Sequence, residues 1–380
     1  MADNVHGTGL PHLLEVLKIV EGAVNADRGK VVAYTEQLAS KLEADGEGRI
    51  ADRLRRTLAQ GKTRELAPSR VAAVGRLPVD GESRLSLADE QIVSPGEVEV
   101  FLAPEARERT DEFLRFVRAA DRLLDQGVGI SPSLLLYGPP GCGKTELGRY
   151  VAAQLGLPLL TARTDALISS FLGSTAKNLR TLFEHAMSRP CVLFLDEFDA
   201  VAKLRDDRHE LGELKRVVVS LLQNIDALDN QTVLLAATNH EHLLDRAIWR
   251  RFAFAIHVDR PTADVRVALF RRFLGSFAGE DDTAIFASAA EGLSGADIRQ
   301  VAEDAKRASI LADVKTVEQA DVLRRILRYR LPAALATNDA LRDRLRKTRD
   351  LDTKVFTYRR LAEIFGVSLG HVSNLLRTKE

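Results

Sequence analysis

One segment constrains the fold of this chain more than any other. Residues 134–145 read Leu-Leu-Leu-Tyr-Gly-Pro-Pro-Gly-Cys-Gly-Lys-Thr, so an apolar run passes directly into the pattern G-x-x-x-x-G-K-T. Residues 146–155 then have the pattern of a helix. A strand before and a helix after is the setting in which such a loop binds phosphate through its backbone N–H groups. The segment therefore predicts an α/β fold that binds a nucleotide, and a chance glycine-rich turn is the alternative.

The residues of this loop have separate expected tasks. Lys144 is expected to reach the β- and γ-phosphates, and the hydroxyl of Thr145 is expected to bind Mg²⁺. The predicted nucleotide contacts in this segment are Gly138, Pro139, Pro140, Gly141, Cys142, Gly143, Lys144, Thr145 and Glu146.

A second buried strand is predicted at residues 191–195, and an acidic pair follows it. Its run of consecutive apolar residues suits a strand that is covered on both faces. Asp196 is placed to bind Mg²⁺, and Glu197 is placed to orient and deprotonate the attacking water. Two carboxylates at a strand end are often only a solvated turn, but together with a phosphate loop they favour catalysis. Asp199 is interpreted as a polar helix start.

A third apolar run, residues 232–238, ends at Asn239, whose amide is placed to hold the water against Glu197. Two adjacent arginines, Arg250 and Arg251, follow farther along the chain. They suit arginine fingers that act on a neighbouring subunit, or a surface pair that binds helix carbonyls or a carboxylate. The spacing alone favours neither interpretation.

These motifs, in this order and spacing, resemble those of AAA+ ATPases. The resemblance covers about residues 100–330 and is most specific to the branch that contains katanin, spastin, the ESCRT-disassembly ATPases and the proteasomal ATPases. It implies a ring, expected to be a hexamer, in which Arg250 and Arg251 act in trans. Residues 292–298 resemble the adenine-side motif of the helical lid, which makes Gly295 and Ala296 expected nucleotide contacts.

Residues 169–183 resemble the first pore loop of that branch and the helix that follows it. The resemblance implies that Phe171, with Leu172 beside it, grips a polypeptide substrate. The alternative is that Phe171 is an ordinary core residue. Ser170 and Ser174 stand where the family often has Lys and Glu, which puts the charge of the pore in doubt.

Composition limits the class of protein. The chain has 380 residues, of which 45% are hydrophobic and 28% charged, as expected for a soluble globular protein of two or three domains. No apolar run approaches eighteen residues, so we expect no membrane span. The N-terminal residues lack the layout of a signal peptide. The two cysteines, Cys142 and Cys191, argue against a disulfide framework and for the cytoplasm.

The sequence predicts five segments. They are an N-terminal helical domain (1–65), a linker (66–99), the AAA+ α/β subdomain with a parallel sheet and flanking helices (100–260), its helical lid (261–330) and a basic C-terminal segment (331–380). The N-terminal helices suit either recruitment of a substrate or adaptor, or a packing appendage of the ring. Charge is uneven, because residues 321–380 contain 14 Lys/Arg against 7 Asp/Glu, which suggests an acidic partner.

Residues 358–377 have the pattern of a helix-turn-helix. Ala362 is small where two helices would cross, Gly366 opens the turn, and Val372 is expected in the core. The candidate DNA contacts are Arg359, Arg360, Ser368, His371, Ser373 and Asn374. Such hairpins also bind proteins, so the sequence leaves both partners open.

The sequence therefore predicts an ATP- and Mg²⁺-dependent ring that remodels or unfolds a protein substrate. Its overall resemblance is to small bacterial AAA ATPases encoded beside a subtilisin-like serine protease, which implies a defence or plasmid-maintenance module. The chain has no H-E-x-x-H pattern and no Ser/His/Asp protease signature, so proteolysis would need a partner. The alternatives are a DNA-associated ATPase or regulator and a nucleotide-gated scaffold. The retained carboxylates, Asn239 and Arg251 argue against the scaffold.

Overall fold

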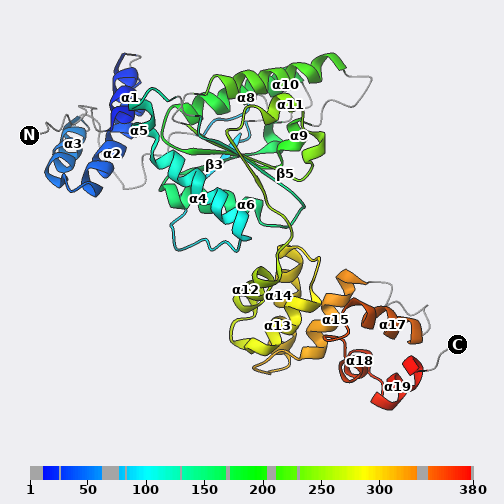
Figure 1. The fold of residues 1–380 in the computed structure, drawn as a ribbon. Helices are drawn as coiled ribbons and strands as arrows, with labels where there is room; N and C mark the ends of the chain where they lie inside the picture. Colours follow the sequence, from blue (N-terminus) through cyan, green and yellow to red (C-terminus); the bar gives the residue numbers. More distant parts are fainter. Residues whose placement is uncertain are drawn as a thin grey trace, which may run out of the picture. The chain divides into compact units, whose positions relative to one another are not determined.

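The computed structural model describes residues 12–24, 27–61, 77–81, 84–128, 131–167, 172–202, 211–228, 232–331 and 341–377 (Figure 1). The chain divides into two compact units. The first contains Met1–Glu99, Glu108–Tyr137 and Thr145–His257, and the second contains Val100–Arg107, Gly138–Lys144 and Val258–Glu380. The phosphate loop therefore groups with the second unit, whereas the strands and most of their covering helices belong to the first.

The first unit is built around a six-stranded sheet. The strands are β1 (Ala88–Gln91), β2 (Ser133–Tyr137), β3 (Leu159–Ala162), β4 (Val192–Leu195), β5 (Val233–Thr238) and β6 (Phe254–His257). Their order is β1-β3-β4-β5-β2-β6, with β1 antiparallel to β3 and all other pairs parallel. This mostly parallel sheet confirms the predicted α/β fold class. Because β5 lies between β2 and β4, the three strands that precede the predicted site end at one edge of the sheet.

Helices cover both faces of this sheet. The helices of this part of the chain are α4 (Pro104–Arg118), α5 (Ala120–Asp125), α6 (Lys144–Leu155), α7 (Thr164–Leu167), α8 (Leu172–Met187), α9 (Phe198–Ala202), α10 (Leu211–Asp226), the 3₁₀ turn η1 (Glu241–Leu243) and α11 (Arg246–Trp249). Helices α8 and α10 lie on one face, and α4 and α6 lie on the other (Figure 1).

Strand β4 shows why the apolar run of residues 192–195 was readable as a doubly covered strand. Leu193 and Leu195 belong to the core cluster that also contains residues of α8 and α10. Phe194 faces the opposite way, and its ring lies so close to Gly148 of α6 that a Cβ there would be 3.1 Å from it. Since successive strand residues point to opposite faces, every residue of the run needs to be apolar.

Part of the stretch predicted as a linker, residues 66–99, belongs to the sheet. Ala88–Gln91 form β1 and pair with β3, and Glu90 forms an ion pair of 2.7 Å with Arg189. Ala88 is buried, whereas Gln91 is exposed. An edge strand that is this short and only partly buried has no apolar run, which is why its sequence resembles a linker.

The N-terminal helices are α1 (Leu13–Val24), α2 (Arg28–Ala44) and α3 (Gly48–Gly61). Helix α1 packs on α2, and α2 packs on α3. The inward side of α1 is partly ionic, because the buried carboxylate of Glu15 pairs with Lys41 of α2 at 2.8 Å. Leu17 and Val20 of α1 are exposed.

The second unit is helical. Its elements are α12 (Ala263–Leu274), the 3₁₀ turn η2 (Gly275–Phe277), α13 (Glu280–Ala289), α14 (Gly295–Leu311), α15 (Gln319–Arg330), α17 (Leu341–Leu351), α18 (Tyr358–Phe365) and α19 (Leu369–Arg377). One hydrophobic cluster contains Phe270 of α12, Ile326 of α15, Leu345 of α17 and Val372 of α19. The last three helices therefore share a core with the helices of the predicted lid.

None of the helices in the described parts of the chain is both long enough and apolar enough to cross a membrane.

Candidate active site

The phosphate loop has a backbone that glycine adopts more easily than any other residue. It connects the end of β2 at Tyr137 to the start of α6 at Lys144. Gly138, Gly141 and Gly143 have φ angles of 133°, 73° and 93°. These angles are costly for a residue with a Cβ atom, so the glycines of the motif fix the curvature of the loop. A loop of this curvature directs successive N–H groups toward one anion.

Lys144 lies against the loop that precedes it. Its Nζ donates hydrogen bonds to the carbonyl oxygens of Gly138 and Pro139, both at 2.7 Å, and the residue is 6% exposed. A buried ammonium needs such partners. These two hydrogen bonds hold the positive charge of Lys144 at the loop, where it is able to attract a phosphate group.

The start of α14 contacts the same loop. The N–H of Ala296 donates to the carbonyl oxygen of Gly141 at 3.0 Å. A Cβ on Gly141 would lie 2.7 Å from Oγ of Ser294, and a Cβ on Gly295 would lie 3.3 Å from that same carbonyl. Ser294 and Asp297 cap the helix reciprocally. The structure thus brings Gly141 together with Gly295 and Ala296, for which the resemblance to AAA+ ATPases implies contacts on the adenine side.

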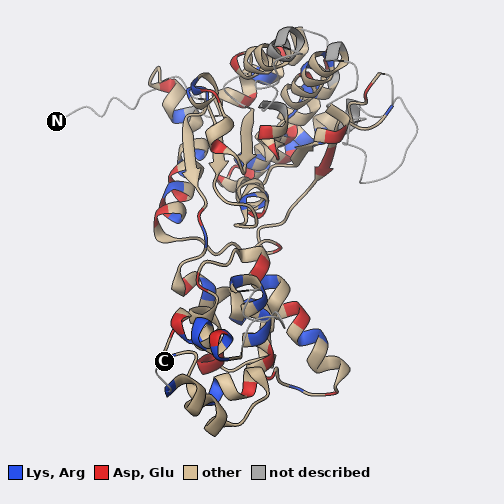
Figure 2. Cartoon of the chain, turned by 90° about the vertical axis from the view of Figure 1, so that its right-hand side faces the viewer, with Lys and Arg blue, Asp and Glu red and all other residues tan. Residues whose placement is uncertain are grey.

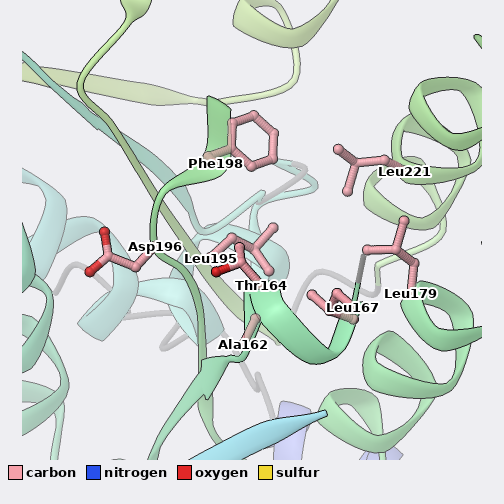
Figure 3. A pocket seen from close by; sticks show the side chains of 8 residues that line it. All are labelled: Ala162, Thr164, Leu167, Leu179, Leu195, Asp196, Phe198 and Leu221. Atoms are coloured by element: carbon pink, nitrogen blue, oxygen red, sulfur yellow. The ribbon is translucent and has the colours of Figure 1, made fainter. Parts of the chain in front are cut away.

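Asp196 forms the centre of a polar group at the end of β4. Thr145 donates its hydroxyl proton to Oδ2 of Asp196 at 2.7 Å, and the N–H of Glu197 donates to Oδ1 at 2.9 Å. The carboxylate points away from a small apolar cavity lined by side chains that include Phe198 and Leu221 (Figure 3). A hydroxyl and a carboxylate oxygen side by side form the oxygen-rich set that Mg²⁺ prefers.

Glu197 has a strained backbone. Its φ angle is 51°, in the left-handed region, and its side chain is exposed. Holding a non-glycine residue there costs on the order of 1–3 kcal/mol, and such strain is concentrated at functional sites. Glu197 adopts this conformation in the turn between β4 and α9, where its side chain is exposed and its N–H is bonded to Asp196.

Asp199 has a role that the sequence did not reveal. Its Oδ1 accepts hydrogen bonds from Oγ1 of Thr238 at 3.0 Å and from the N–H of Asn239 at 3.4 Å. Asp199 lies in the first turn of α9, as the sequence predicted, but it also fixes the end of β5 and therefore the position of Asn239. The signal in the sequence that could have revealed this contact was the hydroxyl of Thr238 and the amide of Asn239 at the end of β5, together with an acidic residue, Asp199, shortly after β4.

The adjacent arginines have different surroundings. Arg251 binds both carboxylate oxygens of Asp226, through Nε at 2.9 Å and Nη2 at 2.8 Å, and it also donates to the carbonyl of Ala247. Arg250 caps the end of α11 through its backbone N–H, which donates to the carbonyl of Arg246, and its exposed guanidinium makes no hydrogen bond or ion pair with the described residues. Arg251 thus makes the contacts of a surface pair, whereas the Arg250 guanidinium is open to another molecule.

For four other residues of the predicted site, the described structure shows no contact with the groups above. Phe171 lies outside the described residues, and Leu172 begins α8. Glu146 pairs with Arg149 at 3.1 Å. Burial raises the pKa of the Cys142 thiol, so this residue is a small neutral member of the loop, and its Sγ lies 3.7 Å from the carbonyl of Pro140.

The candidate DNA contacts also differ in exposure. Arg359 is exposed and pairs with Glu363 of the same helix at 3.4 Å, whereas Arg360 binds Gln319 and the carbonyl of Val355, both at 2.8 Å. The other predicted contacts lie at or on α19, where one is half-buried (Ser373) and three are exposed (Ser368, His371 and Asn374).

No group of three or more His, Cys, Asp or Glu side chains suited to a metal ion occurs within the described ranges.

Known proteins resemble this chain over the part that contains the site. Residues 134–260 match the family described as "ATPase family associated with various cellular activities (AAA)". An uncharacterized AAA family ATPase, y4kL, of Sinorhizobium fredii is 39% identical over 300 residues, which cover 76% of this chain and 87% of the relative.

The ATP-dependent zinc metalloproteases FtsH of Sulfurovum sp. and Thermus thermophilus are 32% and 35% identical, over 59% and 53% of this chain. The chain spans about a third of the length of these FtsH relatives, 35% and 34%. With the phosphate loop, the acidic strand end and these matches in agreement, the chain belongs to the AAA family of ATPases, which bind and hydrolyse ATP.

Proposed function

We propose that this chain works as a ring-shaped ATPase that remodels protein substrates. The observation that supports it most directly is the contact of Thr145 with Asp196, beside the exposed and strained Glu197. The names of the FtsH relatives, ATP-dependent zinc metalloproteases, favour a protein as the substrate. We also propose that the chain belongs to the branch of AAA+ ATPases that contains katanin and spastin.

Thr145 and Asp196 would hold Mg²⁺ together with the phosphates of ATP. When bound, this ion neutralises charge on the β- and γ-phosphates. The fit is chemical, since the two side chains supply a hydroxyl and a carboxylate oxygen 2.7 Å apart. The glycines of the loop and Lys144 bind the phosphates themselves.

Glu197 and Asn239 act on the attacking water. The carboxylate of Glu197 accepts a proton from the water as its oxygen attacks the γ-phosphorus and the bond to the β-phosphate oxygen breaks. The Asn239 amide orients the water, and Asp199 holds the end of β5 that carries this amide. ADP and inorganic phosphate are the products.

Arg250 completes the site of a neighbouring subunit. Its guanidinium is exposed, and it has no ion pair in the described parts of its own chain. An arginine supplied in trans stabilises the charge that develops on the transferred phosphoryl group. Arg251 positions the turn by binding Asp226. This division of tasks requires an assembly, for which we propose a closed ring of six subunits.

The proposal for how the ring holds its substrate comes from the sequence pattern of residues 169–183. We propose that Phe171 and Leu172 line the ring pore and grip the polypeptide. Because the chain has no H-E-x-x-H pattern, any proteolysis would come from a partner, for which we propose a subtilisin-like serine protease in a bacterial defence or plasmid-maintenance module. A cytoplasmic location completes the proposal and agrees with the two free thiols, Cys142 and Cys191.

The test is a comparison of Lys144→Ala with Glu197→Gln in the full chain. Lys144→Ala is expected to lose ATP binding. Glu197→Gln is expected to bind ATP normally and to lose about 10²–10⁴-fold in hydrolysis rate, the usual contribution of a general base. Glu184→Gln is the control, because it is also a change of an exposed carboxylate in the first unit, and Glu184 pairs with Arg180 of the same helix, α8, at 2.8 Å.

Proteins retained by the ATP-bound Glu197→Gln assembly are then identified by mass spectrometry. Normal turnover of Glu197→Gln would remove Glu197 from its role. An assembly that hydrolyses ATP but neither retains nor unfolds any polypeptide would contradict remodelling.

A further inference from the structure

The last two helices form a closed helical hairpin. Helix α18 ends at Phe365, and α19 begins at Leu369. Gly366 has a φ angle of 65°, and the N–H of Val367 bonds back to the carbonyl of Ala362 at 3.0 Å. A glycine in the left-handed conformation followed by this bond ends a helix sharply. The short turn has the length and the glycine of a helix-turn-helix.

Helix α19 has one buried side and one polar, exposed side. Val372 is fully buried in the cluster shared with α12–α15. His371, Asn374 and Arg377 recur at intervals of three along the opposite side, and all are exposed. We name these three residues, with Ser368 at the helix start, the α19 face. Residues 366–377 contain no Asp or Glu, so no carboxylate of this segment opposes an anion.

The basic residues around α19 divide into structural and exposed groups. Arg344 and Arg349 lie over the rings of Phe365 and Tyr358, at 5.1 and 4.3 Å from the ring centroids, and Arg360 binds within the unit. The exposed Lys and Arg side chains of this part are Arg346, Lys347, Lys354, Arg359 and Arg377. Residues 341–377 contain nine Lys/Arg and four Asp/Glu, and basic positions lie along several helices of this unit (Figure 2). The exposed surface is therefore suited to a polyanion.

We propose that the α19 face binds duplex DNA, with α19 in the major groove and Arg359 and Arg377 on the phosphates. Asparagine and histidine side chains are able to hydrogen-bond base edges, and the exposed Leu369 at the start of α19 is able to contact a thymine methyl group. An acidic protein partner fits less well, because stable protein interfaces have apolar or aromatic side chains at their centre and the middle of this face is polar. DNA binding is separate from the remodelling activity proposed above.

The test uses the full chain, since α17–α19 share their core with α12–α15. Fluorescence anisotropy measures binding to a labelled random-sequence duplex of about three helical turns, between about 50 and 200 mM salt. Wild type is expected to bind, with affinity that falls steeply as salt rises because counterions are released. Arg359→Ala and Arg377→Ala are each expected to reduce the slope of log K against log salt by about one.

Arg307→Ala is the matched control. Arg307 is an exposed arginine of the same unit, on α14, and it pairs with Asp304 at 2.8 Å. Its removal is expected to leave the slope unchanged. Equal thermal unfolding temperatures establish that the variants are folded.

Two results would overturn the proposal. One is a folded wild type that does not bind the duplex even at about 50 mM salt. This result overturns the proposal even if the same protein binds polyglutamate, which stands for an acidic protein partner. The other is a set of Arg359→Ala, Arg377→Ala and Arg307→Ala slopes that do not differ.

Selection from a random duplex library tests whether α19 reads sequence. Wild type is expected to enrich a motif, and Asn374→Ala is expected to reduce the preference at one position of that motif by about tenfold, as for loss of a bidentate contact. Gln300→Ala, which removes an exposed amide from α14 of the same unit, is the control. An Asn374→Ala protein that enriches the wild-type motif to the same degree would show that Asn374 does not read a base, and a wild type that enriches no motif would show that α19 does not read sequence.

Discussion

The strand-end cluster of the first unit and the α19 face of the second both consist of polar side chains, but they are held differently. In the strand-end cluster, which comprises Thr145, Asp196, Glu197, Asp199 and Asn239, hydrogen bonds between Thr145 and Asp196 and from β5 to Asp199 fix the geometry. On the α19 face, His371 and Arg377 extend into solvent from a helix whose opposite side is packed. Chemistry on a bound ligand requires groups placed in advance, whereas binding to a long polyanion tolerates side chains that become ordered on contact.

The largest effect is expected at Arg250, because its exposed guanidinium is proposed to act on the phosphates bound by a neighbouring subunit. Arg250→Ala should reduce steady-state ATP hydrolysis by about 10³-fold or more, the contribution of an arginine finger, without changing stability. Arg251→Ala should instead lower the free energy of unfolding by about 1 kcal/mol, because its partly exposed pair with Asp226 is lost. Turnover rates and urea unfolding curves measure both quantities.

Mixing Arg250→Ala with Lys144→Ala protein then tests action in trans. Partial recovery of hydrolysis is expected, since an intact arginine meets an intact phosphate loop across an interface. Mixed assemblies that form by sedimentation but show no recovery would argue that Arg250 acts elsewhere.

A smaller effect is expected at Asp199, which does not touch the nucleotide in the proposed mechanism. Asp199→Ala should lower kcat by about tenfold while leaving the KM for ATP within about twofold, because the end of β5 that carries Asn239 loses its anchor. Asp199→Asn keeps an acceptor oxygen and should recover most of the rate. A KM that rises as much as kcat falls would place Asp199 in nucleotide binding instead.

Gly141 tests the contact of the phosphate loop with the start of α14. Gly141→Ala places a Cβ at a φ of 73° and 2.7 Å from Oγ of Ser294, so we expect a loss of about 1–3 kcal/mol in unfolding free energy and weaker ATP binding. Gly143→Ala is the control, because its φ of 93° is also strained but no atom lies within 4 Å. If thermal unfolding shows that Gly141→Ala and Gly143→Ala lose the same amount of stability, backbone strain alone explains the loss and the contact with Ser294 contributes nothing.

The smallest effect is expected on the α19 face. His371→Ala should change the unfolding free energy by less than about 0.5 kcal/mol, as for an exposed side chain. The neighbouring Val372→Ala should cost about 2 kcal/mol, because it removes buried methyl groups from the shared core. Urea denaturation compares the two, and a large loss for His371→Ala would mean that this side chain is structural.

The sequence was most informative where a local pattern is sufficient. Residues 134–145 predicted a strand, a loop and a helix, because the required glycines and the apolar run are contiguous. The structure has β2, three glycines with positive φ, and α6 in these places. The alternation of covered faces likewise made β4 readable from its apolar run alone. The edge strand β1 was not readable, because it is short, polar on one side and defined mainly by its partner β3.

By itself, the sequence determined the α/β class, the phosphate loop, the acidic pair and the terminal helical hairpin, since each depends on residues adjacent in the chain. Only the tertiary structure decided that Asp199 anchors Asn239, that Arg251 is bound by Asp226 while Arg250 is exposed, and that Arg360 faces inward. It also placed Gly141 against Ala296 and gave Glu197 its strained backbone. These features are contacts between residues distant in the chain, or a backbone angle imposed by the surrounding fold. Local sequence patterns therefore do not predict them.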